Sequence, residues 1–361
     1  AWTIQIIRGQ VIFLIALTLS YSLYLLGKNG LLSPDTVYGN TELPLLLAVV
    51  SISTIFASFN SIYLLVLNRK LMMRKLIIID LLSQAIGLIF MLVWAWFHRD
   101  IWALVFGGIL GAIAKMLLTH ILNIGERCQF QWNRSAVSEI FHFGKWIFLS
   151  SILGFLLNQG DKILLGGMIS SDMLGVYTIA FFLANALKDV ITRLISSVFY
   201  PVLSETLRNT PQNLKSTYYK IRNKIDALTF FVAGFIYASG DFIISILYDD
   251  RYRDAGWMLQ ILSLTLIASG SFLSEQCFLA FGRSKLLTII KAIQTVGFYV
   301  LLPLFFYKFG MLGAVWSMVL IAFIRVLVSS IYMKMYFFYD IKKELLMFPL
   351  IFAGYAIGCI L

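Results

Sequence analysis

The sequence predicts an all-α, polytopic membrane protein, and three observations carry that prediction. Sixty per cent of the 361 residues are hydrophobic, only 13% are charged, and the mean hydropathy is +0.86. The apolar residues gather in about eleven stretches of 17 or more, each long enough to cross roughly 30 Å of hydrocarbon. Short polar connectors separate them. Because lipid offers the backbone no hydrogen-bond partners, spans of this length are expected to be helices.

The expected spans follow one another along the whole chain. They cover residues 9–26, 43–67, 76–97, 101–123, 146–167, 174–199, 227–248, 256–281, 286–307, 310–333 and 345–361. The longest connector, 200–226, mixes Tyr218, Tyr219 and Ile221 with basic residues. This composition fits either a short helix on the membrane surface or a solvated linker.

The Lys and Arg residues of the connectors are divided unequally between the two sides of the membrane. One side holds 18 and the other holds 5, and six more lie within spans. The richer side is expected to be cytoplasmic, which places Ala1 in the cytoplasm and Leu361 outside. The net charge of +11 therefore reflects topology, and no nucleic-acid partner is expected.

Two pairs of segments indicate an internal repeat. Residues 58–70 resemble 271–285, and residues 111–121 resemble 321–331, with an offset that slides from 213 to 210 residues. Six spans separate the paired segments, so the two copies would share one orientation in the membrane. Such parallel repeats form two helical bundles around a central cavity that holds the substrate path.

The middle of the chain carries a set of loosely spaced motifs. They are FG at Phe143–Gly144, NQGDKILLG at Asn158–Gly166, LGVY at Leu174–Tyr177 and FYPVLSE at Phe199–Glu205. With these motifs the sequence resembles oligosaccharide flippases of the Wzx type, in the multidrug/oligosaccharidyl-lipid/polysaccharide export superfamily. The resemblance extends over most of the chain.

The resemblance implies an architecture for the chain. Residues 1–123 would form an N-terminal bundle without its first two helices, 140–333 a six-helix C-terminal bundle, and 345–361 the start of an accessory helix pair. Eleven spans with residue 1 in the cytoplasm fit that reading, because two missing spans preserve the orientation.

The resemblance also implies a function. The substrate would be an undecaprenyl-diphosphate-linked oligosaccharide, carried across the bacterial inner membrane by alternating access. Expected partners are this substrate and the membrane lipids, with a polysaccharide polymerase and chain-length machinery as further candidates. A monomer without a cofactor is expected, and coupling to a proton or sodium gradient is left open.

Basic residues within the spans are the candidate substrate contacts, because each costs about 2.5–3.5 kcal/mol to insert and so calls for an explanation. Lys188 lies nearest mid-membrane and is the first candidate for binding the diphosphate. Lys115, Arg193, Lys291 and Arg325 lie in the cytoplasmic half of their spans. For these four, the alternative is that long basic side chains reach the headgroups without serving a ligand.

The acidic residues within the spans allow several interpretations. Asp161 and Lys162 lie in the NQGDK motif, where they would either couple an ion or fix helix packing. Glu275 would neutralise Lys291 or Arg325, or take up a proton. Asp189 and Arg193 are four residues apart and could pair along one helix. Asp80 is close to a span end and is expected to be solvated.

Other classes of function find less support in the sequence. Three Cys and three His residues show no metal-ligand spacing, so no metal site is expected. A multidrug or lipid-precursor exporter of the same superfamily is the alternative transporter, although a cationic drug would favour acidic rather than basic intramembrane residues. A membrane-embedded polymerase or glycosyltransferase would need a sizeable external loop, and the one charged candidate, 249–254, looks like a hydrated turn. We therefore expect no enzymatic activity.

Overall fold

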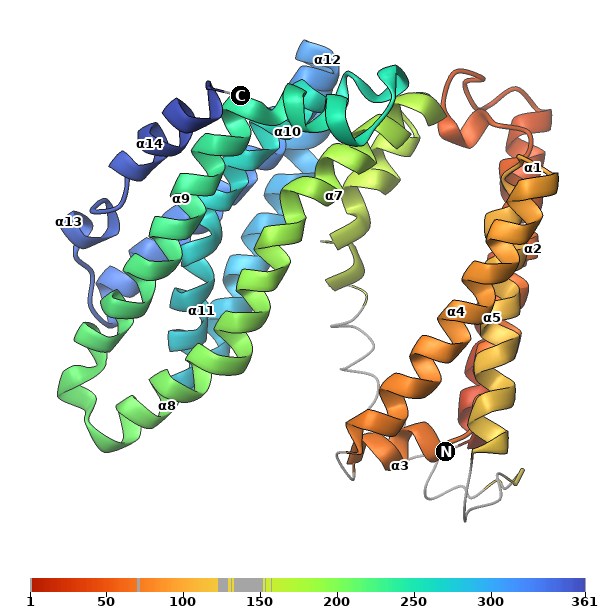
Figure 1. The fold of residues 1–361 in the computed structure, drawn as a ribbon, viewed down its shortest axis with the longest axis horizontal. Helices are drawn as coiled ribbons and strands as arrows, with labels where there is room; N and C mark the ends of the chain where they lie inside the picture. The colour runs from red at the N-terminus through yellow and green to blue at the C-terminus, as the bar shows by residue number, and fades with distance from the viewer. Residues whose placement is uncertain are drawn as a thin grey trace. The chain divides into compact units, whose positions relative to one another are not determined.

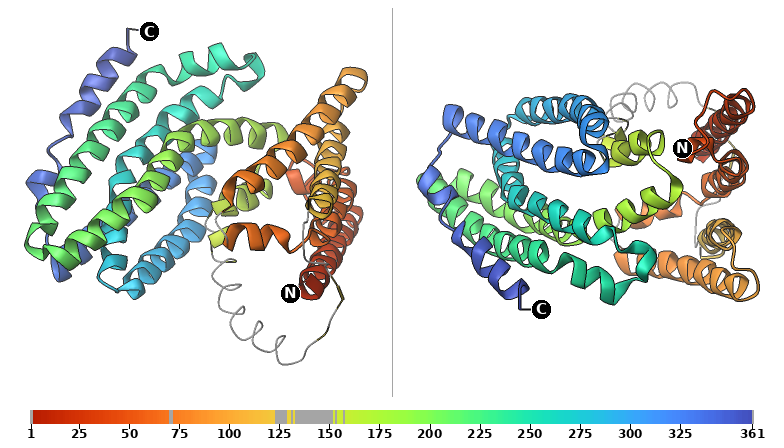
Figure 2. Two further views of the ribbon diagram at one scale, coloured as in Figure 1. Left: turned by 60° about the horizontal axis from the view of Figure 1, so that its bottom comes forward. Right: turned by 90° about the horizontal axis from the view of Figure 1, so that it is seen from above.

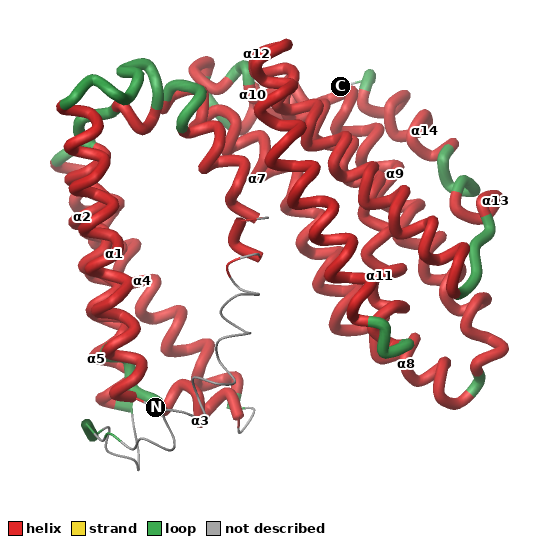
Figure 3. Tube along the Cα trace, turned by 180° about the vertical axis from the view of Figure 1, so that it is seen from behind, coloured by secondary structure: helices red, strands yellow, loops and turns green. Residues whose placement is uncertain are grey.

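The computed structural model describes residues 2–69, 72–122, 129–130, 132, 152, 154–156 and 158–360. Within these ranges the chain is helical and contains no β-strand (Figure 3). This confirms the all-α prediction. Contacts between Cα atoms divide the chain into two compact units, 1–152 and 153–361, which are described separately. The bundle boundaries 1–123, 140–333 and 345–361 stay predictions.

The first unit is a set of long antiparallel helices (Figure 1). Its elements are α1 (Trp2–Lys28), the short η1 (Val37–Gly39), α2 (Leu43–Ser58), α3 (Tyr63–Arg69), α4 (Met73–Phe97) and α5 (Trp102–Ile121). Helix α1 packs on α2, α2 packs on α5, and α4 packs on α5. The expected span 43–67 is thus interrupted, because the helix ends at Ser58 and resumes at Tyr63.

Small residues set the close approach of α4 and α5. On α5, Gly107 and Gly111 are four residues apart and meet Gly87 of α4, which lies four residues after Ser83. A Cβ atom added at Gly107 would lie 2.8 Å from Met91 Cβ and 3.0 Å from the Gly87 carbonyl oxygen. In lipid, helices associate through such close backbone packing, because the surrounding tails are as apolar as the side chains.

The second unit begins with described helical residues 158–166, and its helices lie side by side (Figures 1 and 2). Its elements are α7 (Ser171–Leu194), the π-turn η2 (Ile195–Phe199), α8 (Tyr200–Asn209), η3 (Pro211–Asn213), α9 (Leu214–Leu247), η4 (Asp250–Tyr252), α10 (Ala255–Ser263), the 3₁₀ segment η5 (Leu264–Gly270), α11 (Ser271–Ala280), α12 (Ser284–Tyr336), α13 (Ile341–Glu344) and α14 (Pro349–Gly358). The expected span 256–281 is therefore a helix whose middle changes from α to 3₁₀ geometry.

The connector 200–226 is largely helical and is not a solvated linker, and its position relative to the membrane surface stays a prediction. It forms α8 and then the first turns of α9, which continues without a break to Leu247. At 34 residues, α9 is about 51 Å long, well beyond the hydrocarbon thickness. Leu214, Tyr218, Ile221 and Ile225 recur at helical spacing and are buried, so tertiary packing holds this end of the helix in place.

Helix α12 contains two of the expected spans. Gly310 lies between them with φ 61° and ψ −146°, a left-handed conformation that glycine adopts without a Cβ clash. Further on, α14 runs along α9 in both views of Figure 2. Gly354 and Gly234 make that approach possible, because a Cβ on either would strike the backbone of the facing helix.

Seven helices are long and apolar enough to cross a membrane, among the residues that the structure describes. The last of them, Lys285–Tyr336, covers both halves of α12. Most of the expected span 146–167 lies outside the described residues. A multi-pass membrane protein is thereby confirmed, and the number of eleven spans stays a prediction.

The order of helices along the chain agrees with the expected repeat. Helices α2 and α10 begin at residues 43 and 255, which are 212 apart. Helices α4 and α12 begin at residues 73 and 284, which are 211 apart. Helix α5 begins at residue 102, and the second half of α12 begins at residue 311, 209 later. The offset shrinks along the chain, as it does in the sequence match.

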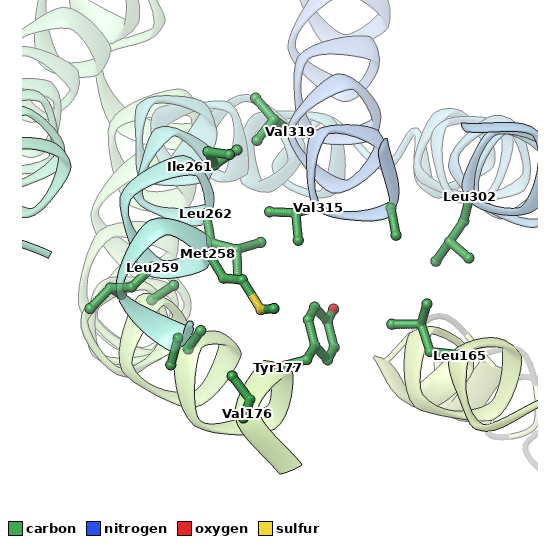
Figure 4. Packing of buried hydrophobic residues seen from close by; sticks show 14 of the residues in the cluster. Leu165, Val176, Tyr177, Met258, Leu259, Ile261, Leu262, Leu302, Val315 and Val319 are labelled. Carbon is green, nitrogen blue, oxygen red and sulfur yellow. The ribbon is translucent and has the colours of Figure 1, made fainter. Parts of the chain in front are cut away.

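Two apolar clusters form the core of the second unit. One gathers Leu165, Tyr177 and Met258 with residues of both halves of α12 (Figure 4). The other gathers buried residues at the opposite ends of the same helices, including Ile191 and Phe278. Buried polar residues lie between and beside the two clusters, together with buried apolar residues such as Phe230, Ala233 and Leu266.

The glycines of α5 provide a test of the packing between α4 and α5. Gly107→Ala should lower the free energy of unfolding by about 1–3 kcal/mol, because backbone and Met91 must shift to admit the methyl group. Gly108→Ala is the matched control, since its Cβ would meet nothing within 4 Å, and it should leave stability unchanged or raise it by up to about 1 kcal/mol. Denaturation in detergent measures both. Equal effects of the two variants would contradict the close approach.

Candidate functional site

Several buried polar residues of the second unit lie between or beside the members of its two apolar clusters along the helices. Helix α7 contributes Lys188 between its two clustered ends, and α12 contributes Arg325. The other members, all buried, are Asp226, Thr229, Thr265, Ser269, Ser271, Ser274, Glu275 and Ser329. We call this set the polar layer. Charged groups at this depth are costly in lipid, so their partners decide what each one can do.

Lys188 and Arg325 are the two cations of the polar layer that lack an acidic partner. The Lys188 ammonium donates to Asn185 Oδ1 at 3.1 Å, one turn away on α7. Neither residue makes an ion pair within 4.0 Å among the described residues. The charge of Arg325 acts unfavourably on Lys188, whereas the charges of Asp189 and Asp161 act favourably on it. An anion placed near both would relieve that repulsion.

Arg325 is held by contacts that leave its charge uncompensated. Its side chain is only 6% exposed, and Nη2 donates to the carbonyl oxygen of Ala268 at 3.0 Å. The guanidinium stacks 3.8 Å from the centroid of the Phe272 ring. Its Nε is buried without a hydrogen-bond partner among the described residues. The 3₁₀ geometry of η5 positions Ala268 and so helps to fix the orientation of the guanidinium.

Glu275 is the acid whose charge acts favourably on Arg325. It is 6% exposed on α11, and the charges of Arg325 and Lys291 act favourably on it without a direct ion pair in the described structure. Lys291 itself lies exposed on the first half of α12. The polar layer thus contains two cations, Lys188 and Arg325, and two acids, Glu275 and Asp226, of which Asp226 is paired with Arg222.

Lys115 has a different environment in the first unit. Its Nζ lies 2.6 Å from Asp80 Oδ1, so that the two residues form an ion pair between α5 and α4. The Asp80 side chain is 32% exposed, and it is therefore paired rather than merely solvated. A role of Lys115 in substrate binding stays a prediction.

Asp161 and Lys162 point to different partners. The Asp161 carboxylate, 3% exposed, accepts a hydrogen bond from the Tyr177 hydroxyl at 2.8 Å. The Lys162 ammonium lies 5.7 Å from the centroid of the Phe181 ring. The NQGDK motif is therefore joined to α7 by two contacts, an arrangement that fits helix packing. Coupling of an ion at Asp161 is a prediction that these contacts do not test.

Arg193 lies exposed near the end of α7, as does Asp189. The expected pair along the helix does not form, since the described structure holds no ion pair between them within 4.0 Å. Helix α7 ends one residue after Arg193, and the π-turn η2 follows it before α8 begins.

The buried network around Arg222 was not predicted from the sequence, because Arg222 was counted among the basic residues of a connector. Arg222 is 5% exposed and binds Asp226, Tyr218 and Glu344. Tyr218, Arg222 and Asp226 are spaced at four-residue intervals, and this pattern in the sequence could have indicated that their side chains interact. Glu344 could not be assigned as the third partner, because only tertiary structure brings it to α9.

The described part of the chain offers no cluster of metal-ligating side chains. No group of three or more His, Cys, Asp or Glu side chains there could hold a metal ion. The charged cluster at 249–254 forms the turn η4, in which Arg251 pairs with Asp249 at 2.7 Å with side chains 80% and 54% exposed. The Arg251 guanidinium lowers the pKa of Asp249 by donating hydrogen bonds to its carboxylate. This is a hydrated turn.

A family model described as "polysaccharide biosynthesis protein" matches residues 1–257. The chain belongs to this family. A comparison with curated proteins gives no significant match.

The fold is similar to that of a solved structure, the lipid II flippase MurJ in an inward closed conformation. The two chains are 17% identical, with a TM-score of 0.67 over 98% of this chain and 76% of the MurJ chain. At this identity the likeness shows the fold. Together with the family match, it confirms the resemblance to flippases of the export superfamily.

Tyr177 offers a test of the contact between the NQGDK motif and α7. Tyr177→Phe should lower the free energy of unfolding by about 1–3 kcal/mol, because the buried Asp161 carboxylate loses its donor. Tyr24→Phe, at a side chain 53% exposed on α1, is the control and should change stability little. Chemical denaturation in detergent compares the two. A Tyr177 variant as stable as the control would show that Asp161 does not depend on this hydroxyl.

Proposed function

We propose that this protein is a flippase that carries an undecaprenyl-diphosphate-linked oligosaccharide across the bacterial inner membrane by alternating access. The observation that supports the proposal most is the polar layer with two cations, Lys188 and Arg325, that no acid neutralises directly. The family match to polysaccharide biosynthesis proteins and the flippase fold agree with it.

The chemistry of the substrate accounts for these residues. A diphosphate cannot cross hydrocarbon unless the protein replaces its hydration with donors and positive charge. The planar guanidinium of Arg325 can bind two phosphate oxygens at once, whereas the Lys188 ammonium acts as a compact point charge. The lipid tail would stay in the bilayer while the phosphates meet these two groups.

The remaining candidate residues have secondary roles in this proposal. Arg193 and Lys291 are exposed and could attract the diphosphate before it reaches the polar layer. Lys115 would have to leave Asp80 to bind a ligand. Asp161, Lys162 and Glu275 are the candidates for coupling to a proton or sodium gradient. No resident cofactor is proposed, and the protein is proposed to act as a monomer.

The proposal includes an orientation and a set of partners. Residue 1 lies on the cytoplasmic side, where the lipid-linked precursor is assembled, and release occurs on the opposite side. A polysaccharide polymerase with its chain-length machinery would consume the product there.

A second candidate is an exporter of another substrate within the same superfamily. The buried acids Asp161, Asp226 and Glu275 favour it, because a cationic drug would need negative partners. Export of a cationic dye by cells that contain the protein would support this second function. Restoration of surface polysaccharide in a flippase-deficient strain would support the first.

Lys188 provides the sharpest test of the flippase proposal. Lys188→Ala should reduce export of the cognate glycan by about tenfold or more, because a charge-assisted contact to the diphosphate is lost. Lys188→Arg should retain part of the activity. Surface polysaccharide in the complemented strain measures export, and immunoblots of membranes check insertion.

Lys224→Ala is the matched control for Lys188, since Lys224 is an exposed lysine outside the polar layer. Export should be unchanged in this control. Unchanged export in Lys188→Ala as well would remove Lys188 from the mechanism.

Single cysteines test the proposed orientation. In a variant whose natural cysteines are replaced by serine, Lys28→Cys should react with a membrane-impermeant maleimide in intact spheroplasts. Arg208→Cys should react only after the membrane is permeabilised, because it lies on the side richer in basic residues. The opposite pattern would reverse the orientation and with it the proposed direction of transport.

A further inference from the structure

The segment that follows α12 docks on α9 and α11. The Phe338 ring lies 5.3 Å from that of Tyr218, and the Phe337 ring lies 4.3 Å from that of Phe281. The backbone N–H of Asp340 donates to the Tyr219 hydroxyl at 2.8 Å. Residues 337–344, which we call the docking segment, thus cover the buried cluster at this end of the second unit.

A single guanidinium holds two carboxylates beneath the docking segment. Arg222 Nε donates to Asp226 Oδ2 at 2.8 Å, and Arg222 Nη2 lies 2.6 Å from Glu344 Oε2. The third nitrogen, Nη1, donates to the Tyr218 hydroxyl at 2.9 Å. All three nitrogens are therefore engaged, and the pair of acids outnumbers its cation by one charge.

Asp226 carries an oxygen that the guanidinium does not reach. Its Oδ1 is buried and has no hydrogen-bond partner among the described residues. Gly270 of η5 lies directly against this carboxylate, so close that a Cβ there would collide with Oδ1 and with Arg222 Nε. An ionised carboxylate oxygen buried in this way costs free energy, and a proton removes much of that cost.

Other charged and titratable groups face the network from each neighbouring element. They are Tyr218 on α9, Cys277 on α11, Arg325 on α12, and Asp340 of the docking segment. Arg325 repels Arg222, while Asp340 and Asp226 both act unfavourably on the charge of Glu344. The Lys343 ammonium lies over the ring of Tyr219, 5.2 Å from its centroid. Burial raises the pKa of Glu344, and Arg222 opposes that rise.

We propose that Asp226, Arg222 and Glu344 form a proton-binding site that takes up one proton when the docking segment closes on α9 and α11. The two carboxyls share that proton, and the guanidinium balances the one negative charge that remains. The site differs from Asp161 and Glu275, and its proton uptake does not depend on the proposed transport function.

The direction in which docking of residues 337–344 changes with pH follows from the pKa of Glu344 in the open and docked states. Glu344 has an ordinary carboxyl pKa of about 4.3 when the segment is open and a raised pKa when it is docked. Protonation of Glu344 therefore stabilises the docked state fully at pH values below the ordinary pKa. That stabilisation is lost as the pH rises through the raised pKa of the docked state.

Proton uptake by the purified full-length chain in nanodiscs tests the site without any substrate. Between about pH 8 and pH 5, infrared difference spectra should show a carboxylic acid C=O band of this site in the wild type, identified by subtracting the spectrum of each variant so that bands of other acids such as Asp161 and Glu275 cancel. Asp226→Asn and Glu344→Gln should each remove that band, because each leaves one carboxylate balanced by Arg222. Asp254→Asn, at an exposed acid outside the network, should keep the band.

Hydrogen exchange of residues 337–344, corrected for the intrinsic pH dependence of exchange, provides the second measurement. Protection should fall in the wild type as the pH rises over the same range, and it should stay constant in Asp226→Asn and Glu344→Gln. Both amide variants keep the size of the natural side chain, so they preserve the packing. A band that persists in both variants, or protection that falls with pH in them as in the wild type, would overturn the proposal.

Discussion

Hydrocarbon can neither hydrate a charge nor supply a hydrogen bond, so a charged side chain within the membrane depends entirely on the partners that the protein provides. The second unit gathers many of its buried polar groups in the polar layer, next to its two apolar clusters. The clusters supply the packing that holds α7, α9, α11 and α12 together. The polar layer supplies the charged and hydrogen-bonding side chains.

Two arginines of this unit show how partners decide function. Arg222 has every nitrogen bound, two of them to carboxylates, and its charge is more than balanced. Arg325 has a carbonyl oxygen and an aromatic ring as partners, and its Nε has none in the described structure. The first is suited to joining segments of the protein, and the second to receiving an anion.

One departure from regular α-helix lies beside the buried charges. The 3₁₀ segment η5 presents the Ala268 carbonyl to Arg325, and Gly270 at its end leaves room for Asp226 and Arg222. The backbone is therefore shaped around the same layer that the side chains form.

The sequence by itself determined the class of the protein, most of its helices and the basic residues that stand out within apolar stretches. These features are local, because twenty apolar residues or a lone Lys188 can be recognised without knowing what lies beside them. Its family resemblance was visible in motifs within one stretch of chain. The connector 200–226 was misjudged, since α9 extends through it only because distant residues bury its apolar face.

Only the tertiary structure decided how the charges are paired. Arg222 looked like any other basic residue of a connector, and its partner Glu344 comes from the far end of the chain. Lys115 and Asp80 became a pair through the contact of two helices, whereas Asp189 and Arg193, well spaced for pairing, remained apart. The reason is physical: hydropathy sums over neighbours in sequence, but an ion pair or an uncompensated charge depends on which side chains meet in space.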